Sequence, residues 1–261
     1  MNAIHNPIGL EVGLNVPAEI GMRLEDVSTP ALIVDLDAFE RNVRKMGEFA
    51  RAMGVRHRAH AKTHKSVDIA RVQIDLGGAC GICCQKVSEA EPMVAGGIDD
   101  VLVSNQVVDP GKIDRLAQLA TKTRILVCVD DPGNVNDLSA ATVRHGATLE
   151  CLVEIDVGAG RCGVQSGQPA VDMAKKIEQA PALRFSGLQA YQGAAQHLRG
   201  YNERKAKIDA AIRQVSDTVA MLEAAGLECD IIGGAGTGVH PGSTTSSSAA
   251  PTSSWTPIIS A

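Results

Sequence analysis

Aromatic residues and positive charge are both scarce in this sequence. The 261-residue chain contains three phenylalanines, two tyrosines and one tryptophan, and its 25 basic side chains are outnumbered by 30 acidic ones. A base-stacking platform needs aromatic rings, and binding to a phosphate backbone needs a basic surface. The composition therefore argues against nucleic acid as a partner, and each aromatic residue becomes worth locating.

The sequence also has little that would direct it to a membrane. It contains no stretch of about 18 consecutive apolar residues, and its N-terminus has neither a basic start nor an apolar segment. We expect no membrane span and a cytoplasmic location. With 44% hydrophobic and 21% charged residues, the chain has the composition of a compact, soluble protein.

The seven cysteines do not form the pattern of a disulfide framework. Their number is odd and they lie in apolar runs, as expected for reduced thiols in a core. Cys80, Cys83 and Cys84 are close enough to suggest metal or redox chemistry, but no second cysteine pair follows at the spacing of a zinc site. We interpret this segment as a buried strand and assign no metal ligands.

Short apolar runs alternate with longer amphipathic segments, which is typical of βαβ units around a parallel sheet. Amphipathic segments 38–53 and 206–225 are each followed by glycine, as helices often are. Eight strands in about 250 residues favour a (β/α)8 barrel of the TIM type over an open, doubly wound sheet. The predicted strands are 31–36, 56–60, 80–84, 101–104, 125–129, 151–155, 185–191 and 229–232.

The end of the sequence departs from this alternation. Residues 239–261 form a tract rich in serine, threonine, proline and alanine, with neither helical nor strand periodicity. We expect this tract not to close the barrel, whose last helix would then be missing.

The second predicted strand and its exit loop are unusually basic. Four cationic or imidazole side chains alternate along it: Arg56, Arg58, His60 and Lys62. At strand spacing they point to one side, where burial without partners would cost several kcal/mol each, so the pattern suggests function. These cations and His64 would favour Lys62 as the neutral amine that Schiff-base chemistry needs. The alternative is a surface lysine at a strand end.

Three further features lie where predicted strands end, which is where such barrels carry their active sites. The last strand runs into a glycine-rich loop, 233–238, whose N–H groups could cradle a phosphate. Arg161 follows the sixth strand and could bind an anionic oxygen. Tyr191 ends the seventh strand, where its ring could lie beside a flat cofactor. A simple turn, a surface ion pair and a core tyrosine are the respective alternatives.

A lysine, a phosphate loop, an arginine and an aromatic ring at the strand ends of one barrel describe a pyridoxal 5′-phosphate site. The chain resembles the D-threonine aldolase and 3-hydroxy-D-aspartate aldolase family, relatives of D-serine dehydratase and of the alanine racemase N-terminal barrel. The matching stretches span residues 29–238 in order. They are TPALIVDLDAFERNVRKM, RAHAKTHKS, GICCQKVSEAE, LVEIDVGAGRCGV, GLQAYQGAAQH and the GTG loop.

The resemblance implies a role for each residue of the family's HxKxH motif. The motif falls on His60, Lys62 and His64. It implies that Lys62 forms the Schiff base and that His60 lies by the cofactor. It also implies that His64 is either the base for the substrate hydroxyl or a residue that surrounds the site.

The other cofactor contacts are implied in the same way. The GTG loop, Gly236, Thr237 and Gly238, would bind the phosphate. Arg161 would lie close to the phenolic oxygen, and Tyr191 would lie beside the pyridine ring.

The activity that the resemblance implies is retro-aldol cleavage of a small D-3-hydroxy amino acid. Details of the opening segment and of the segment ERKAKIDAAI favour 3-hydroxy-D-aspartate aldolase, which releases glycine and glyoxylate. Either Arg58 or a residue from the missing region could bind the second carboxylate. The alternatives are D-threonine aldolase, a D-serine or 3-hydroxyaspartate dehydratase, and a non-catalytic pyridoxal phosphate homeostasis protein. A homodimer is compatible with the sequence.

The resemblance ends at the glycine-rich loop. Family members continue into a last helix and a β domain with a divalent-metal pair, Mn²⁺ or Mg²⁺, whose ligands we do not find. A one-base frame slip between about Gly238 and Thr252 would turn a family segment, YIFMDADYQ, into residues 252–259. We divide the chain into an extension (1–28), an incomplete barrel (29–238) and an out-of-frame tail (239–261). We expect poor solubility and little aldolase turnover.

Overall fold

A computed structural model describes residues 11–234, 236 and 256–260. The chain divides into two compact units, residues 1–42 and 43–261, and each is described by itself. In the first unit, a single-turn 3-10 helix, η1 (Leu24–Asp26), precedes the start of α1 (Leu36–Ala52).

The first predicted strand, residues 31–36, is not a strand. Its backbone is irregular, and Leu32 is 95% exposed. Asp35 instead begins a helix, because its carboxylate accepts a hydrogen bond from the N–H of Ala38 at 2.9 Å, as an N-cap residue does. The strand prediction was wrong, whereas the helix predicted over 38–53 is confirmed as α1.

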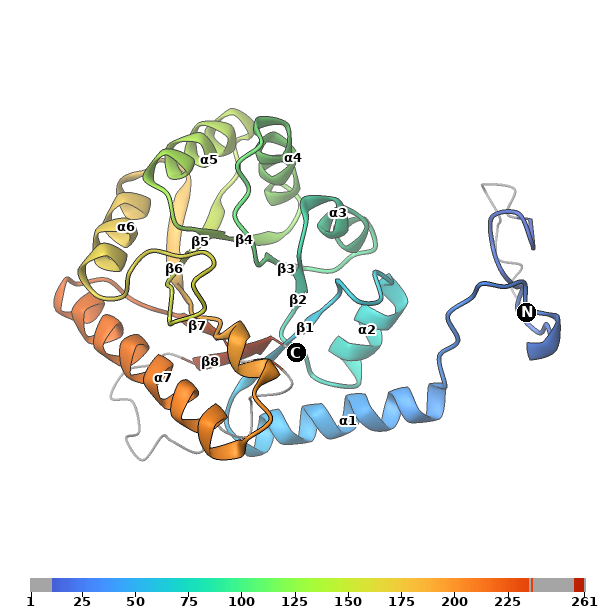
Figure 1. Ribbon diagram of the computed structural model, residues 1–261. Helices are drawn as coiled ribbons and strands as arrows, with labels where there is room; N and C mark the ends of the chain where they lie inside the picture. Colours follow the sequence, from blue (N-terminus) through green and yellow to red (C-terminus); the bar gives the residue numbers. More distant parts are fainter. Residues whose placement is uncertain (1–10, 235, 237–255, 261) are drawn as a thin grey trace. The chain divides into compact units, whose positions relative to one another are not determined.

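The second unit is a closed barrel of eight parallel strands, and Figure 1 shows helices α2 to α7 around it. The strands are β1 (Arg56–His60), β2 (Ile82–Cys84), β3 (Asp100–Val103), β4 (Arg124–Val129), β5 (Leu149–Glu154), β6 (Leu183–Gln189), β7 (Ile231–Gly234) and β8 (Thr256–Ser260). The helices are α2 (Val67–Asp75), α3 (Val87–Ala95), α4 (Pro110–Ala120), α5 (Pro132–His145), α6 (Gln168–Gln179), the 3-10 helix η2 (Gly193–His197) and α7 (Tyr201–Ala224). The predicted barrel is confirmed, and the open sheet is excluded.

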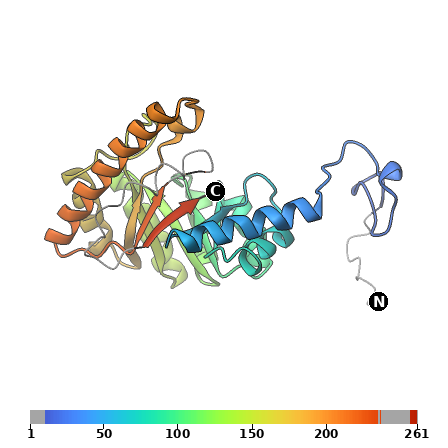
Figure 2. The ribbon, with the colours of Figure 1, turned by 90° about the horizontal axis from the view of Figure 1, so that it is seen from below.

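The eighth strand comes from a tract in which we predicted none. β8, the red arrow in Figure 2, pairs in parallel with β7 on one side and with β1 on the other. The expectation that the tract cannot close the barrel was therefore wrong. Ile258 and Ile259 suit a strand, but two such residues among prolines and serines are too short a pattern to be recognised. Residues 239–255 of the tract lie outside the described part.

An aspartate at the N-cap marks the start of two helices, α4 and α5, which follow β3 and β4. Asp109 accepts a hydrogen bond from the N–H of Lys112 at 3.0 Å, and Asp131 accepts one from the N–H of Asn134 at 2.9 Å. Each aspartate precedes a proline at the first helical position, where no N–H is needed. These caps fix the loops after β3 and β4. None of the described helices is long and apolar enough to cross a membrane.

The core has two layers, one between strands and helices and one inside the barrel. The inner layer consists of Cys83, Leu102, Leu126, Cys128, Leu152 and Ile231. All seven cysteines are free, and Cys83 and Cys84 are buried in β2, which confirms the interpretation of that segment as a buried strand.

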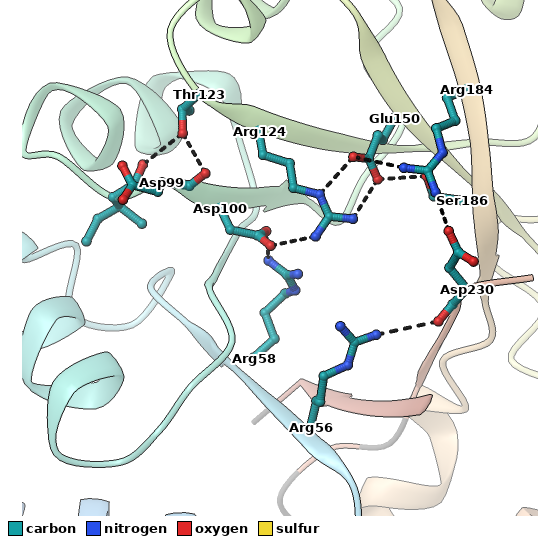
Figure 3. Close-up of polar contacts among 11 residues, drawn as sticks. Arg56, Arg58, Asp99, Asp100, Thr123, Arg124, Glu150, Arg184, Ser186 and Asp230 are labelled. Atoms are coloured by element: carbon teal, nitrogen blue, oxygen red, sulfur yellow. Dashed lines mark hydrogen bonds and ion pairs between the residues drawn. The ribbon is translucent and has the colours of Figure 1, made fainter. Parts of the chain in front are cut away.

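Charged side chains near the amino-terminal ends of the strands form a chain of ion pairs, which we call the floor network (Figure 3). Arg58 of β1 pairs with Asp100 of β3, and Asp100 also pairs with Arg124 of β4 at 2.8 Å. Arg124 donates two hydrogen bonds, of 2.8 and 2.6 Å, to Glu150 of β5. Arg58, one of the cations that looked out of place in a barrel strand, therefore has a partner.

The floor network continues to the other side of the barrel. Arg184 of β6 lies 3.7 Å from Glu150 and also pairs with Asp230, whose carbonyl lies 3.5 Å from Arg56 (Figure 3). Arg58 thus faces the floor and is 1% exposed. This arrangement removes it as a candidate for binding a substrate carboxylate.

Candidate active site

Lys62 lies just beyond the carboxyl end of β1. The N–H of Ala61 donates to the carbonyl of Cys83 at 2.8 Å, which continues the β1–β2 pairing up to the residue before the lysine. The Lys62 side chain is exposed, and no described residue pairs with its amine. The amine is therefore available to a ligand at this end of the barrel.

His60 lies two residues before Lys62, and the charge of the Lys62 amine affects the pKa of its ring. Burial and, after it, the charge of Lys62 lower the pKa of His60 to about 4, while Glu89 acts in the opposite direction. The N–H of Lys62 donates to Nδ1 of His60 at 3.3 Å. His60 is thus neutral at pH 7, with Nδ1 as an acceptor.

Removing the charge of Lys62 should raise the pKa of His60. In Lys62→Met we expect the His60 ring to titrate above its value of about 4, as followed by NMR, whereas Lys122→Met, at an exposed distant site, should leave it unchanged. The pKa of His60 in the folded protein lies below the ordinary value of 6.5, so folding favours the neutral ring. The contribution of His60 to the free energy of unfolding is therefore complete above pH 6.5 and is lost as the pH falls toward 4. An unchanged titration in Lys62→Met would contradict this placement.

His64 is half-buried in the same exit loop, beside α2. The N–H of Ser66 donates to its Nδ1 at 3.0 Å, and its Nε2 is buried without a hydrogen-bond partner among the described residues. Burial lowers the pKa of His64, while Gln73 of α2 and Ser66 act to raise it. Neither ring nitrogen is open to a ligand in this arrangement, which favours His64 as a residue around the site over His64 as the base for the substrate hydroxyl.

Arg161 lies in the loop after β5, whose backbone is held by two carboxylates. Oδ1 of Asp156 accepts hydrogen bonds from the N–H groups of residues 158–160 at 2.9 to 3.0 Å. Oδ2 of Asp130, after β4, accepts one from the N–H of Gly163 at 2.8 Å. These hydrogen bonds fix the path of the loop. Arg161 lies at the carboxyl end of the barrel, where the sequence predicted it.

Gly163 allows this path, and replacing it should disturb the loop. Its φ is +106°, and a Cβ atom there would lie 2.6 Å from the backbone N of Asp156. We expect Gly163→Ala to destabilise the fold by about 2 to 3 kcal/mol. Gly160→Ala is the control, with φ of +63° and open space, and should cost about 1 kcal/mol. Equal effects in urea unfolding would contradict this account.

Tyr191 follows β6 and meets the glycine-rich loop. A Cβ atom at Gly236 would lie 3.3 Å from the Tyr191 ring and 2.3 Å from the amide nitrogen of Gln196. Gly236 therefore lets the backbone approach the ring closely, and the structure brings these two predicted residues together. Thr237 and Gly238 lie outside the described residues, so their role stays a prediction.

Glu154, which ends β5, was not predicted as a site residue from the sequence. Its side chain is 6% exposed, accepts a hydrogen bond from Nε2 of Gln106 at 2.7 Å and lies 3.5 Å from Nη2 of Arg161. Burial raises the pKa of Glu154, while Gln106 and Arg161 act to lower it. A carboxylate that ends an apolar strand was the one signal that could have found it.

Comparison with known proteins identifies the fold family. Residues 34–241 match the family described as the alanine racemase N-terminal domain. The chain belongs to this family. The 3-hydroxy-D-aspartate aldolase of Paracoccus denitrificans (strain Pd 1222) is 55% identical over 241 residues, which are 92% of this chain and 62% of that protein. The D-threonine aldolase of an Arthrobacter species is 45% identical over 227 residues, 87% of this chain and 60% of that protein.

A solved structure gives the same assignment. The crystal structure of D-threonine aldolase from Filomicrobium marinum superposes on this alanine racemase N-terminal domain with a TM-score of 0.88 and 49% identity, covering 94% of this chain and 64% of that one. The resemblance inferred from the motifs is confirmed. The chain spans less than two thirds of the length of the curated relatives it matches.

Proposed function

We propose that the chain is the cofactor-binding barrel of a pyridoxal phosphate-dependent aldolase that cleaves a D-3-hydroxy amino acid, with 3-hydroxy-D-aspartate as the substrate. The observation that carries this proposal is that the amine of Lys62 lies at the rim of the barrel and pairs with no described residue. Arg161, Tyr191 and Gly236 follow strands that end at the same rim. The 55% identity to a 3-hydroxy-D-aspartate aldolase supports the choice of substrate.

The described residues fit pyridoxal phosphate. Lys62 offers an amine for covalent attachment, and Gly236, which has no side chain, lets the backbone of the glycine-rich loop pass close to the Tyr191 ring. When bound, the cofactor supplies the electron sink for the broken Cα–Cβ bond. In the proposal, Thr237 and Gly238 complete the phosphate contacts.

The protein residues would bind and orient the reacting groups. With the cofactor bound, Arg161 would offer a cation to an anionic oxygen of the cofactor, and Tyr191 would limit how the pyridine ring lies. Both residues would thereby help to orient the bond that is to be broken. In the proposal, His64 either takes the proton of the β-hydroxyl or surrounds the site.

The described residues do not fit the divalent metal expected for the family. Among them, no group of three or more histidine, cysteine, aspartate or glutamate side chains could hold a metal ion. We therefore assign no step to a metal in this chain.

D-Threonine aldolase is the second candidate, favoured by the relatives of 45% and 49% identity. The two activities share glycine as a product and differ in the aldehyde. Purified chain with pyridoxal phosphate and Mn²⁺ should be incubated with each substrate. We expect slow, equimolar glycine and glyoxylate from 3-hydroxy-D-aspartate.

The other products would each redirect the assignment. Faster release of acetaldehyde from D-threonine would favour the second candidate, and ammonia with an oxo acid would replace cleavage by dehydration. Cofactor bound at Lys62 without any product would support a non-catalytic binding protein. A chain that binds no cofactor would contradict the proposal.

A further inference from the structure

Glu154 is a buried acid at the rim for which the proposed reaction has no direct use. It ends β5, and its carboxylate is 6% exposed, whereas the Arg161 side chain is 57% exposed. A buried carboxylate is costly unless it is paired. One of its oxygens accepts a hydrogen bond from Gln106 at 2.7 Å, and the other lies 3.5 Å from the guanidinium of Arg161. Glu154 therefore joins the loop after β3 to the loop after β5.

The path of the Arg161 backbone does not depend on this carboxylate. Asp156 and Asp130 hold the loop through its N–H groups, and the N–H of Val164 donates to the carbonyl of Glu154 at 2.9 Å. The Glu154 side chain acts instead on the long, exposed side chain of Arg161, which would otherwise sample many rotamers. The two oxygens of Glu154 have different partners. The hydrogen bond from Gln106 holds the carboxylate in place, and the carboxylate in turn restrains the guanidinium of Arg161.

We infer that Glu154 is a positioning residue that holds the guanidinium of Arg161 in one orientation at the mouth of the barrel. This inference rests on the proposed function, in which Arg161 faces the cofactor. A planar guanidinium presents its donors in a fixed fork, so its orientation decides whether they reach an anionic oxygen. Pre-organising that fork removes a cost that cofactor binding would otherwise bear.

The first experiment needs no cofactor. NMR relaxation of the Nε–H group of Arg161, assigned with Arg161→Lys, should show an ordered side chain in the unmodified protein and a mobile one in Glu154→Gln. The control is Glu89→Gln, a second buried rim carboxylate, whose contacts are the N–H of Gln85 and the amine of Lys65. It should leave Arg161 ordered. Equal mobility in the unmodified protein and Glu154→Gln would overturn the inference.

The second experiment is a double-mutant cycle read by titration with pyridoxal phosphate. Glu154→Gln should weaken cofactor binding by about fivefold and shift the pH profile of the bound cofactor's absorption band, but should change neither by more than about twofold in the Arg161→Ala background. Glu154→Asp keeps the charge on a shorter side chain and should recover part of the affinity. Losses that add in full would overturn the inference, because Glu154 would then act independently of Arg161.

The two experiments separate this inference from the proposed function. If the unmodified protein binds no cofactor, the proposed function fails, while the mobility of Arg161 still tests whether Glu154 holds it. If Glu154→Gln frees Arg161 without any change in affinity or absorption, the inferred role toward the cofactor is wrong while the proposed function stands.

Discussion

Replacing Lys62 with arginine is expected to abolish covalent attachment of pyridoxal phosphate. Arginine keeps the charge and nearly the length of lysine, but its guanidinium does not lose its proton and is no nucleophile. After borohydride reduction, peptide mapping of the unmodified protein should find the cofactor on Lys62. In Lys62→Arg the reduced label should fall by at least about 100-fold.

Lys65→Arg is the matched control for this experiment. Lys65 lies in the same exit loop and is also exposed, but its amine is 3.8 Å from Glu89. The label should be unchanged in this variant. Undiminished label in Lys62→Arg would contradict the assignment of the lysine, and equal losses in both variants would point to damage of the loop.

Several strands appear close to where the sequence predicts them, and β1 has the predicted bounds, 56–60. β4 and β5 are almost continuous apolar runs, and both appear within two residues of their predicted ends. The apolar run 31–36 has a similar composition but no strand partner, and β8 has two partners despite a weak pattern. Pairing depends on residues far away in sequence, and a local pattern does not contain that information.

The same reason limits what the sequence says about the site. Arg161 and Tyr191 were placed correctly at the rim because the carboxyl ends of parallel strands all meet there. Arg58 was misjudged because its partner, Asp100, is 42 residues away. Glu154 was missed because Gln106 is 48 residues away. The alternation of residues along a strand predicts the face on which a side chain lies. Its position along the barrel axis and its partners depend on residues that are distant in the sequence.

Removing the buried end of the floor network should destabilise the barrel far more than removing its exposed end. Arg58 is 1% exposed and packs against Gly81, where an added Cβ would lie 2.5 Å from its Nη1. Arg58→Ala would leave a cavity and take one of two cations from Asp100, and we expect a loss of about 3 to 5 kcal/mol. The Arg184 side chain is 51% exposed, so Arg184→Ala should cost about 0.5 to 1 kcal/mol.

Urea unfolding of both variants measures this difference, and Arg58→Met separates its two causes. Methionine restores most of the volume without the charge, so recovery of stability in Arg58→Met assigns the loss to the cavity, and no recovery assigns it to Asp100. Equal losses in Arg58→Ala and Arg184→Ala would contradict the account of a buried end. A different result would assign Arg58 to the substrate site: unchanged stability in Arg58→Ala together with weakened binding of 3-hydroxy-D-aspartate. A cation that acts only in the floor network does not contact the substrate, so its removal should not weaken binding without a loss of stability.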